Sequence, residues 1–233
     1  GASLAQALVE FNTESQASPE TSLAFSLGII GVMMFPLVAR AFGIIASIVG
    51  ILFVHMDREE KMDPMTALNR GYYVAVVLAM GAFAGATYWL LDVEGAPSAW
   101  WHFFLCGLIG VATSVAFVYI TQYYTEHKYR PVKSIAEASE TGPATNIISG
   151  ISVGLECVAV PVVVMGGALL GSYFLGRAAI PEVAFEAGLF GTAVATMGML
   201  ATAAFILAMD TFGPITDNAG GIVEMSQQPE EVR

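Results

Sequence analysis

The sequence contains few charged residues, and few of those are basic. Lys, Arg, Asp and Glu make up 12% of the 233 residues, whereas 56% are hydrophobic. A soluble domain carries about 25% charged residues, so this composition favours a multi-pass membrane protein over a water-soluble one. Nine Lys and Arg residues stand against 20 Asp and Glu, and no basic patch occurs. The charge balance therefore excludes a nucleic-acid partner.

Residues typical of several catalytic and metal sites are also scarce. Cys106 and Cys157 lie in separate apolar stretches, which indicates buried free thiols rather than a disulfide framework or a metal site. His55, His102 and His127 are isolated from one another, so no zinc-binding spacing occurs. Neither a glycine-rich phosphate loop nor a serine nucleophile elbow is present. Carboxylates remain as the candidates for chemistry.

Long apolar runs predict an all-α bundle of transmembrane helices. Crossing a bilayer takes about 20 apolar residues, and five runs are long enough, at about 22–54, 71–91, 99–122, 143–175 and 184–209. Pro36 and Pro161 are expected to bend the first and fourth of these. Since no domain boundary or repeat is visible, we expect residues 1–233 to form part of a single transmembrane domain. The absent initiator Met and the polar C-terminal end indicate a fragment of a longer chain.

The basic residues predict the orientation of these spans. Loops 55–70 and 125–142 carry three Lys or Arg residues each. The loops at the opposite ends of the spans, 12–21, 92–98 and 176–183, carry one in total. By the positive-inside rule, the two basic loops lie on the cytoplasmic side. The polar segment 210–224, which follows the fifth span, is then cytoplasmic as well. The thin loops and acidic balance fit a prokaryotic plasma membrane.

Three carboxylates recur at seven-residue intervals after the fifth span, at Asp210, Asp217 and Glu224. On a helix they would form one stripe with steps of roughly 10 Å. Asp217 and Asn218 offer oxygen ligands for a hard cation, but the same residues are also typical caps of a short following helix. Both interpretations remain open from the pattern. Asp210 fits either a ligand or a solvated boundary residue, and Glu224 fits a solvated helix face.

Two further charges lie inside predicted spans, Arg40 in the first and Glu156 in the fourth. A charge within a bilayer costs a few kcal/mol unless it is paired or hydrated. The two residues are therefore candidates for an intramembrane charge pair, either structural or lining an ion path.

Three stretches of the sequence carry longer motifs. They are Asp210-Thr-Phe-Gly-Pro-Ile-Thr-Asp-Asn-Ala-Gly-Gly-Ile, Gln122-Tyr-Tyr-Thr-Glu-His-Lys-Tyr-Arg-Pro-Val-Lys133 and Thr141-Gly-Pro-Ala-Thr-Asn-Ile-Ile-Ser-Gly. The first is similar to the signature that ends a core helix in the membrane-integral inorganic pyrophosphatases. All three occur in the order and spacing of that family, which the chain resembles over about residues 20–225.

The resemblance implies a homodimeric ion pump with sixteen transmembrane helices per subunit, of which this chain is a central part. Such a pump hydrolyses cytoplasmic diphosphate with Mg²⁺ and moves H⁺, or in some members Na⁺, out of the cytoplasm. By its position in the motif, Asp217 matches an aspartate that holds the magnesium–diphosphate complex. Asp210 and Asn218 belong to the same signature and are weaker matches. Some members also require K⁺, and the position that decides this lies beyond Arg233.

The chain also departs from the family pattern. The family's other acidic clusters and its late Lys- and Asp-rich helix are absent from residues 1–233. The chain would thus supply one side of a catalytic site and be inactive by itself. A secondary cation transporter or channel with carboxylates at its helix mouths is the alternative, and a structural membrane scaffold is a third possibility.

Overall fold

The computed structural model describes residues 2–14, 19–55, 64–92 and 96–227. These residues form helices and no β-strand, which confirms the all-α prediction. In chain order the helices are α1 (Ala2–Glu14), α2 (Pro19–Leu52), α3 (Pro64–Leu90), α4 (Ala99–Thr125), α5 (Arg130–Thr141), α6 (Pro143–Ala179), the 3₁₀ turn η1 (Pro181–Val183), α7 (Ala184–Met199) and α8 (Ala203–Met225).

The expected number of spans is confirmed. Among the described residues, four helices are long and apolar enough to cross a membrane, and a bent pair makes a fifth span. The four are α2, α3, α4 and α6, and the pair is α7 with α8. Pro36 and Pro161 lie inside α2 and α6, and both helices continue through them.

The fifth span differs from the prediction of one continuous helix over 184–209. α7 ends at Met199, α8 begins at Ala203, and the two are bent by 40°. Between them the backbone makes tight turns, with the Ala201 N–H bonded to the Gly198 carbonyl and the Ala203 N–H bonded to the Leu200 carbonyl. No proline marks this break in the sequence, and contacts with other helices hold it.

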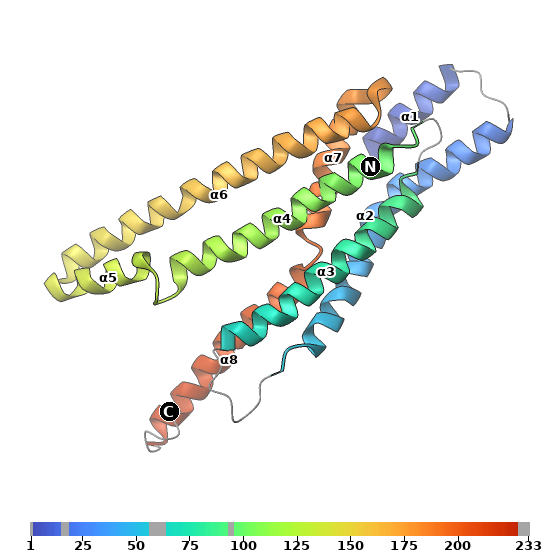
Figure 1. Cartoon of the computed structure of the whole chain (residues 1–233). Helices are drawn as coiled ribbons and strands as arrows, with labels where there is room; N and C mark the ends of the chain where they lie inside the picture. The colour runs from blue at the N-terminus through green and yellow to red at the C-terminus, as the bar shows by residue number, and fades with distance from the viewer. Residues whose placement is uncertain (1, 15–18, 56–63, 93–95, 228–233) are drawn as a thin grey trace.

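The bend divides the helices into two arms that diverge towards one end of the molecule (Figure 1). α7 packs against α4 and α6, which with α5 form the first arm. Beyond the bend, α8 packs instead against α2 and α3, which form the second arm. A single span thus belongs to both arms, and α3 also contacts α4 directly.

Aromatic side chains fill the region where the arms meet. The Phe35 ring from α2 lies edge-on to Phe83 of α3 with centroids 5.3 Å apart, and Phe190 of α7 lies 5.0 Å from Phe103 of α4. All four side chains are almost fully buried. Further along α3 and α8, Tyr72 packs on Phe205 with centroids 6.0 Å apart. These contacts hold α2, α3, α4 and both halves of the broken span together.

The end of α7 is also held by direct backbone contact with α4. A Cβ placed on Gly110 would lie 1.8 Å from the Ala195 carbonyl oxygen, so only glycine fits there. By contrast, a Cβ on Gly81 or Gly85 of α3 would meet nothing within 4 Å, and the same holds for Gly150 of α6. Gly81 and Gly85 therefore make no close packing contact within the described part of the chain.

The helix ends alternate as the loop charges predict. The end of α2, the start of α3, the turn between α4 and α5, and the end of α8 all lie at the end where the arms diverge (Figure 1). The basic loop residues Arg58 and Lys61 lie outside the described residues. The carboxylates of α8 thus share one end of the bundle with the basic residues after α4.

We expect Gly110→Ala to lower the free energy of unfolding by about 1–3 kcal/mol, because the new methyl group overlaps the α7 backbone. The measurement is denaturation of the detergent-solubilised chain by SDS, with circular dichroism as the readout. Gly150→Ala is the matched control, since its methyl group meets open space. Equal unfolding free energies for the two variants would contradict the packing described here.

Candidate functional site

The three stripe carboxylates lie on one uninterrupted helix. α8 runs from Ala203 to Met225 and contains Asp210, Asp217 and Glu224, so the predicted stripe with steps of roughly 10 Å is present. Because the helix continues through Asp217 and Asn218, neither residue caps a following helix. The capping interpretation is therefore wrong.

Pro214 lies inside α8 and changes the backbone near Asp210. Proline has no N–H, so the Asp210 carbonyl lacks its usual helical donor. The Thr216 hydroxyl donates to the Phe212 carbonyl at 2.8 Å, and the Thr211 hydroxyl donates to the Ala208 carbonyl at 2.7 Å. Next to Pro214, Asp210 thus offers a backbone oxygen as well as its carboxylate. Hard cations such as Mg²⁺ prefer these oxygen ligands.

The part of α8 that carries the signature motif is exposed in this chain. Every side chain from 210 to 220 is exposed. Among the described residues, no group of three or more His, Cys, Asp or Glu side chains is close enough to hold a metal ion. A Mg²⁺ ion takes about six oxygen ligands, so the carboxylates of α8 do not form a metal site by themselves.

A cavity of about 530 Å³ lies between α4 and α8, with Asp210 in its lining. α4 contributes a polar face to this cavity through Ser114, Thr121, Gln122 and Thr125. The hydroxyl groups of Ser114 and Tyr72 are 3.4 Å apart, which links the cavity to α3. Asp210 therefore faces a mostly apolar space between the two arms that has one polar face on α4, whereas Asp217 does not line it.

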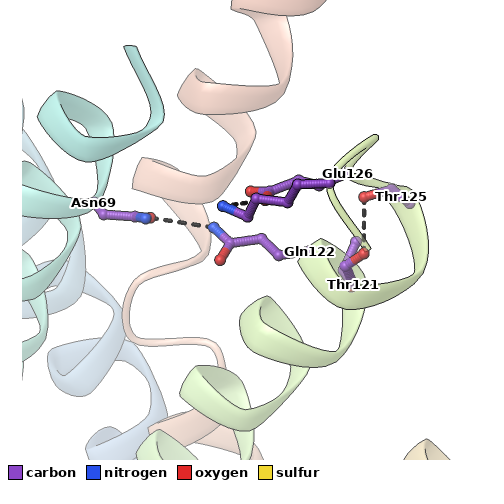
Figure 2. A network of polar contacts seen from close by, with 6 residues as sticks. Asn69, Thr121, Gln122, Thr125 and Glu126 are labelled. Carbon is purple, nitrogen blue, oxygen red and sulfur yellow. Dashed lines mark hydrogen bonds and ion pairs between the residues drawn. The ribbon is translucent and has the colours of Figure 1, made fainter. Parts of the chain in front are cut away.

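A hydrogen bond joins the two arms beside this cavity, and further polar contacts lie next to it on α4 and in the turn after α4 (Figure 2). Figure 2 shows the Gln122 amide of α4 donating to the Asn69 side-chain oxygen of α3, at 3.4 Å. One turn further along α4, the Thr125 hydroxyl donates to the Thr121 carbonyl at 2.7 Å. Glu126 then forms an ion pair with Lys128 at 2.6 Å. Of these residues, Thr121, Gln122 and Thr125 also line the cavity.

The structure does not bring Arg40 and Glu156 together. The Arg40 guanidinium donates to the Leu200 carbonyl at 2.5 Å, at the break between α7 and α8. Glu156 is exposed and lines a separate cavity of about 390 Å³ with Tyr123 and Arg130. No ion pair joins the two charges among the described residues, so the expected pair is not formed here.

The two thiols differ from each other. Cys106 is fully buried, as expected, and its sulfur lies 3.4 Å from the Ser172 carbonyl. Cys157 is only half-buried.

Comparison with known protein families shows where the chain belongs. The family model of the inorganic H⁺ pyrophosphatases matches residues 12–233. The chain belongs to this family. The resemblance drawn from the three sequence motifs is thereby confirmed.

Several named proteins are similar to this H⁺ pyrophosphatase chain. It is 58% identical over 207 residues to the K(+)-insensitive pyrophosphate-energized proton pump 2 of Moorella thermoacetica, covering 88% of this chain and 29% of the relative. It is 52% identical to the pyrophosphate-energized membrane proton pump 3 of Arabidopsis thaliana, covering 87% of this chain and 26% of that protein. Against the pyrophosphate-energized proton pump 2 of Rhizobium leguminosarum bv. trifolii, identity is 40% and the match covers 86% of this chain and 90% of the relative. The chain thus spans under a third of the length of the first two relatives.

Two features of this H⁺ pyrophosphatase chain were missed in the sequence. The polar face of α4 has a helical signal, because Ser114 and Thr121 are seven residues apart and Thr125 follows four later. The contact of Arg40 with the Leu200 carbonyl had no signal, because a backbone acceptor cannot be recognised from residue types.

The chain 1–233 alone should not hydrolyse diphosphate, since its signature carboxylates do not surround a metal ion. The test is phosphate release by the purified chain in proteoliposomes with Mg²⁺ and diphosphate. We expect no release above protein-free vesicles. Turnover that disappears in Asp217→Ala would contradict this expectation.

Proposed function

We propose that the protein containing this chain is a membrane-bound diphosphatase that couples hydrolysis of Mg–diphosphate to the outward pumping of H⁺. The signature Asp210-Thr-Phe-Gly-Pro-Ile-Thr-Asp-Asn-Ala-Gly-Gly on the exposed helix α8 carries this proposal. Membership of the inorganic H⁺ pyrophosphatase family supports it. The relatives' names supply the energy source and the transported ion.

In this proposal Asp217 is the ligand of the magnesium–diphosphate complex, Asn218 follows it directly, and Asp210 lies about two turns earlier on α8. Diphosphate is a multiply charged anion, so Mg²⁺ must neutralise it before water can attack phosphorus. Carboxylate and amide oxygens have the hardness that Mg²⁺ requires. Exposure of these side chains leaves them available to segments outside the described residues, which would complete the site.

The proposal places the carboxylates of α8 on the cytoplasmic side, where diphosphate is hydrolysed. Support comes from the basic residues after α4, which lie at the same end of the bundle (Figure 1). Protons released at this end would leave through the membrane part, away from the cytoplasm. A homodimer in a prokaryotic plasma membrane belongs to the same proposal through the family resemblance.

We expect Asp217→Ala in the full-length protein to lower Mg–diphosphate hydrolysis about 100-fold or more. A metal ion contributes several kcal/mol to such a reaction, and each 1.36 kcal/mol corresponds to a tenfold change in rate. The measurement is phosphate release by membranes that contain equal amounts of each variant.

Glu224→Ala is the matched control for Asp217→Ala. It removes a carboxylate from the same helix, seven residues further on, at a position outside the signature. We expect it to retain hydrolysis within about threefold, as for a surface change worth ~0.5 kcal/mol. Unchanged hydrolysis in Asp217→Ala would remove this residue from the site. Ion flux driven by a gradient and not by diphosphate would instead favour a secondary transporter.

We further expect hydrolysis to be independent of K⁺ and pumping to be independent of Na⁺. Four similar relatives are named K(+)-insensitive proton pumps, at identities from 38% to 58%. Diphosphate hydrolysis and vesicle acidification are measured in K⁺-containing, Na⁺-containing and choline buffers. An absolute requirement for either ion would contradict this assignment.

A further inference from the structure

The break between α7 and α8 is buried in the region where the two arms meet. Ala201 and Thr202 are exposed by only 4% and 2%. A helix break frees carbonyl groups that a continuous helix would satisfy, and inside a membrane protein they need other donors. At the Leu200 carbonyl the turn itself supplies one donor, the Ala203 N–H at 3.1 Å, and the second lone pair of this oxygen is open to a partner from another helix.

Arg40 of α2 is this partner. Its guanidinium donates to the Leu200 carbonyl at 2.5 Å, across 160 residues of sequence. No carboxylate forms an ion pair with Arg40 within the described ranges of the chain. The C-terminal end of α7 supplies compensation instead, because the last carbonyls of a helix carry the negative end of its dipole. A cation suits this end of α7 for the same reason.

The rest of the α2 face fits closely against the break. A Cβ on Gly43, almost one turn after Arg40, would lie 2.5 Å from the Ala201 carbonyl oxygen. Ala46 packs with Ala201 in a small buried cluster. α2 thus contacts the break through a charged donor, a glycine and an alanine in succession.

The two sides of the break differ in how firmly they are held. On the α7 side, Gly198 touches the backbone of Gly107, where an added Cβ would come within 2.2 Å of the carbonyl oxygen. On the α8 side, Phe205 is buried against Tyr72, but all residues from 210 to 220 are exposed. The direction of the exposed part of α8 therefore depends on the geometry at residues 200–202 together with the packing of Phe205.

A small change at the break is amplified at the carboxylates. Asp217 lies 14 residues after the start of α8, which is roughly 20 Å along the helix axis. A rotation of about 10° at the break would move this carboxylate by ~4 Å. Reacting groups misplaced by as little as ~1 Å can lose about 100-fold in rate.

We propose that Arg40 is a positioning residue of the pump. By holding the Leu200 carbonyl it fixes the bend between α7 and α8, and with it the position of Asp217 relative to the bound diphosphate. This inference rests on the proposed function, because it assigns Arg40 a task in diphosphate binding and pumping.

The test compares Arg40→Met with Arg40→Lys in the full-length protein in proteoliposomes. Arg40→Met removes the donor and should raise the KM for Mg–diphosphate about tenfold or more and lower the number of H⁺ pumped per diphosphate. Arg40→Lys keeps one charged donor and should restore most of both properties. Arg177→Gln is the control, because Arg177 is exposed in the last turn of α6.

Hydrogen exchange gives a second readout that does not depend on activity. Arg40→Met should speed amide exchange over residues 200–210 and leave α4 unchanged. Wild-type KM, pumping ratio and exchange in Arg40→Met would overturn the proposal. Equal defects in Arg40→Lys and Arg40→Met with unchanged exchange would also overturn it. If the wild-type protein does not hydrolyse diphosphate, the proposed function fails, while the exchange comparison still decides whether Arg40 holds the bend.

A second variant decides the question if Arg40→Met does not reach the membrane. Gly43→Ala pushes on the Ala201 carbonyl without changing any charge, and should raise the KM for Mg–diphosphate in the same direction. Gly81→Ala, where an added Cβ meets nothing within 4 Å in this chain, is the matched control. A wild-type KM in Gly43→Ala would overturn the dependence of the site on the bend.

Discussion

A polypeptide that breaks its helix inside a membrane protein must find hydrogen-bond partners for the freed carbonyls, and this requirement governs the fifth span. Here the Leu200 carbonyl has two partners, the Ala203 N–H of the turn and the Arg40 guanidinium from α2. The same break moves the chain from the arm of α4 and α6 to the arm of α2 and α3. The direction of the signature helix, the cavity beside Asp210 and the divergence of the arms all depend on this one turn.

The helices could be predicted from the sequence because apolar runs of the length of a bilayer have few alternatives. The break at residues 200–202 could not, because Met199-Leu-Ala-Thr-Ala contains no proline and no polar run. Tertiary contacts hold it: Gly43 of α2 touches Ala201, and Gly110 of α4 touches the α7 backbone. Such glycines appear in the sequence only as small residues, and their partners depend on the packing of distant helices.

The candidate site was predicted unevenly for similar reasons. The spacing of Asp210, Asp217 and Glu224 defined a stripe, and α8 carries it. The choice between a cap and a ligand at Asp217 could not be made from spacing, because it required knowing whether the helix continues past Pro214. The pairing of Arg40 with Glu156 was expected from charge alone, and the structure gives Arg40 a backbone partner instead. The partners of charged residues on separate helices can be predicted only when the packing of those helices is known.

In the proposed site, the spacing of the stripe also gives Asp210 and Asp217 different roles. Oxygen ligands of one Mg²⁺ ion lie about 2.1 Å from it, so two of them are at most ~4.2 Å apart. Asp210 and Asp217 are roughly 10 Å apart along α8 and do not share one ion. Asp210 lines the cavity between α4 and α8, and Asp217 does not. Asp210 therefore suits a role on the membrane side of the site, and Asp217 suits binding of the metal–diphosphate complex. The bend at Leu200 fixes the position of both residues.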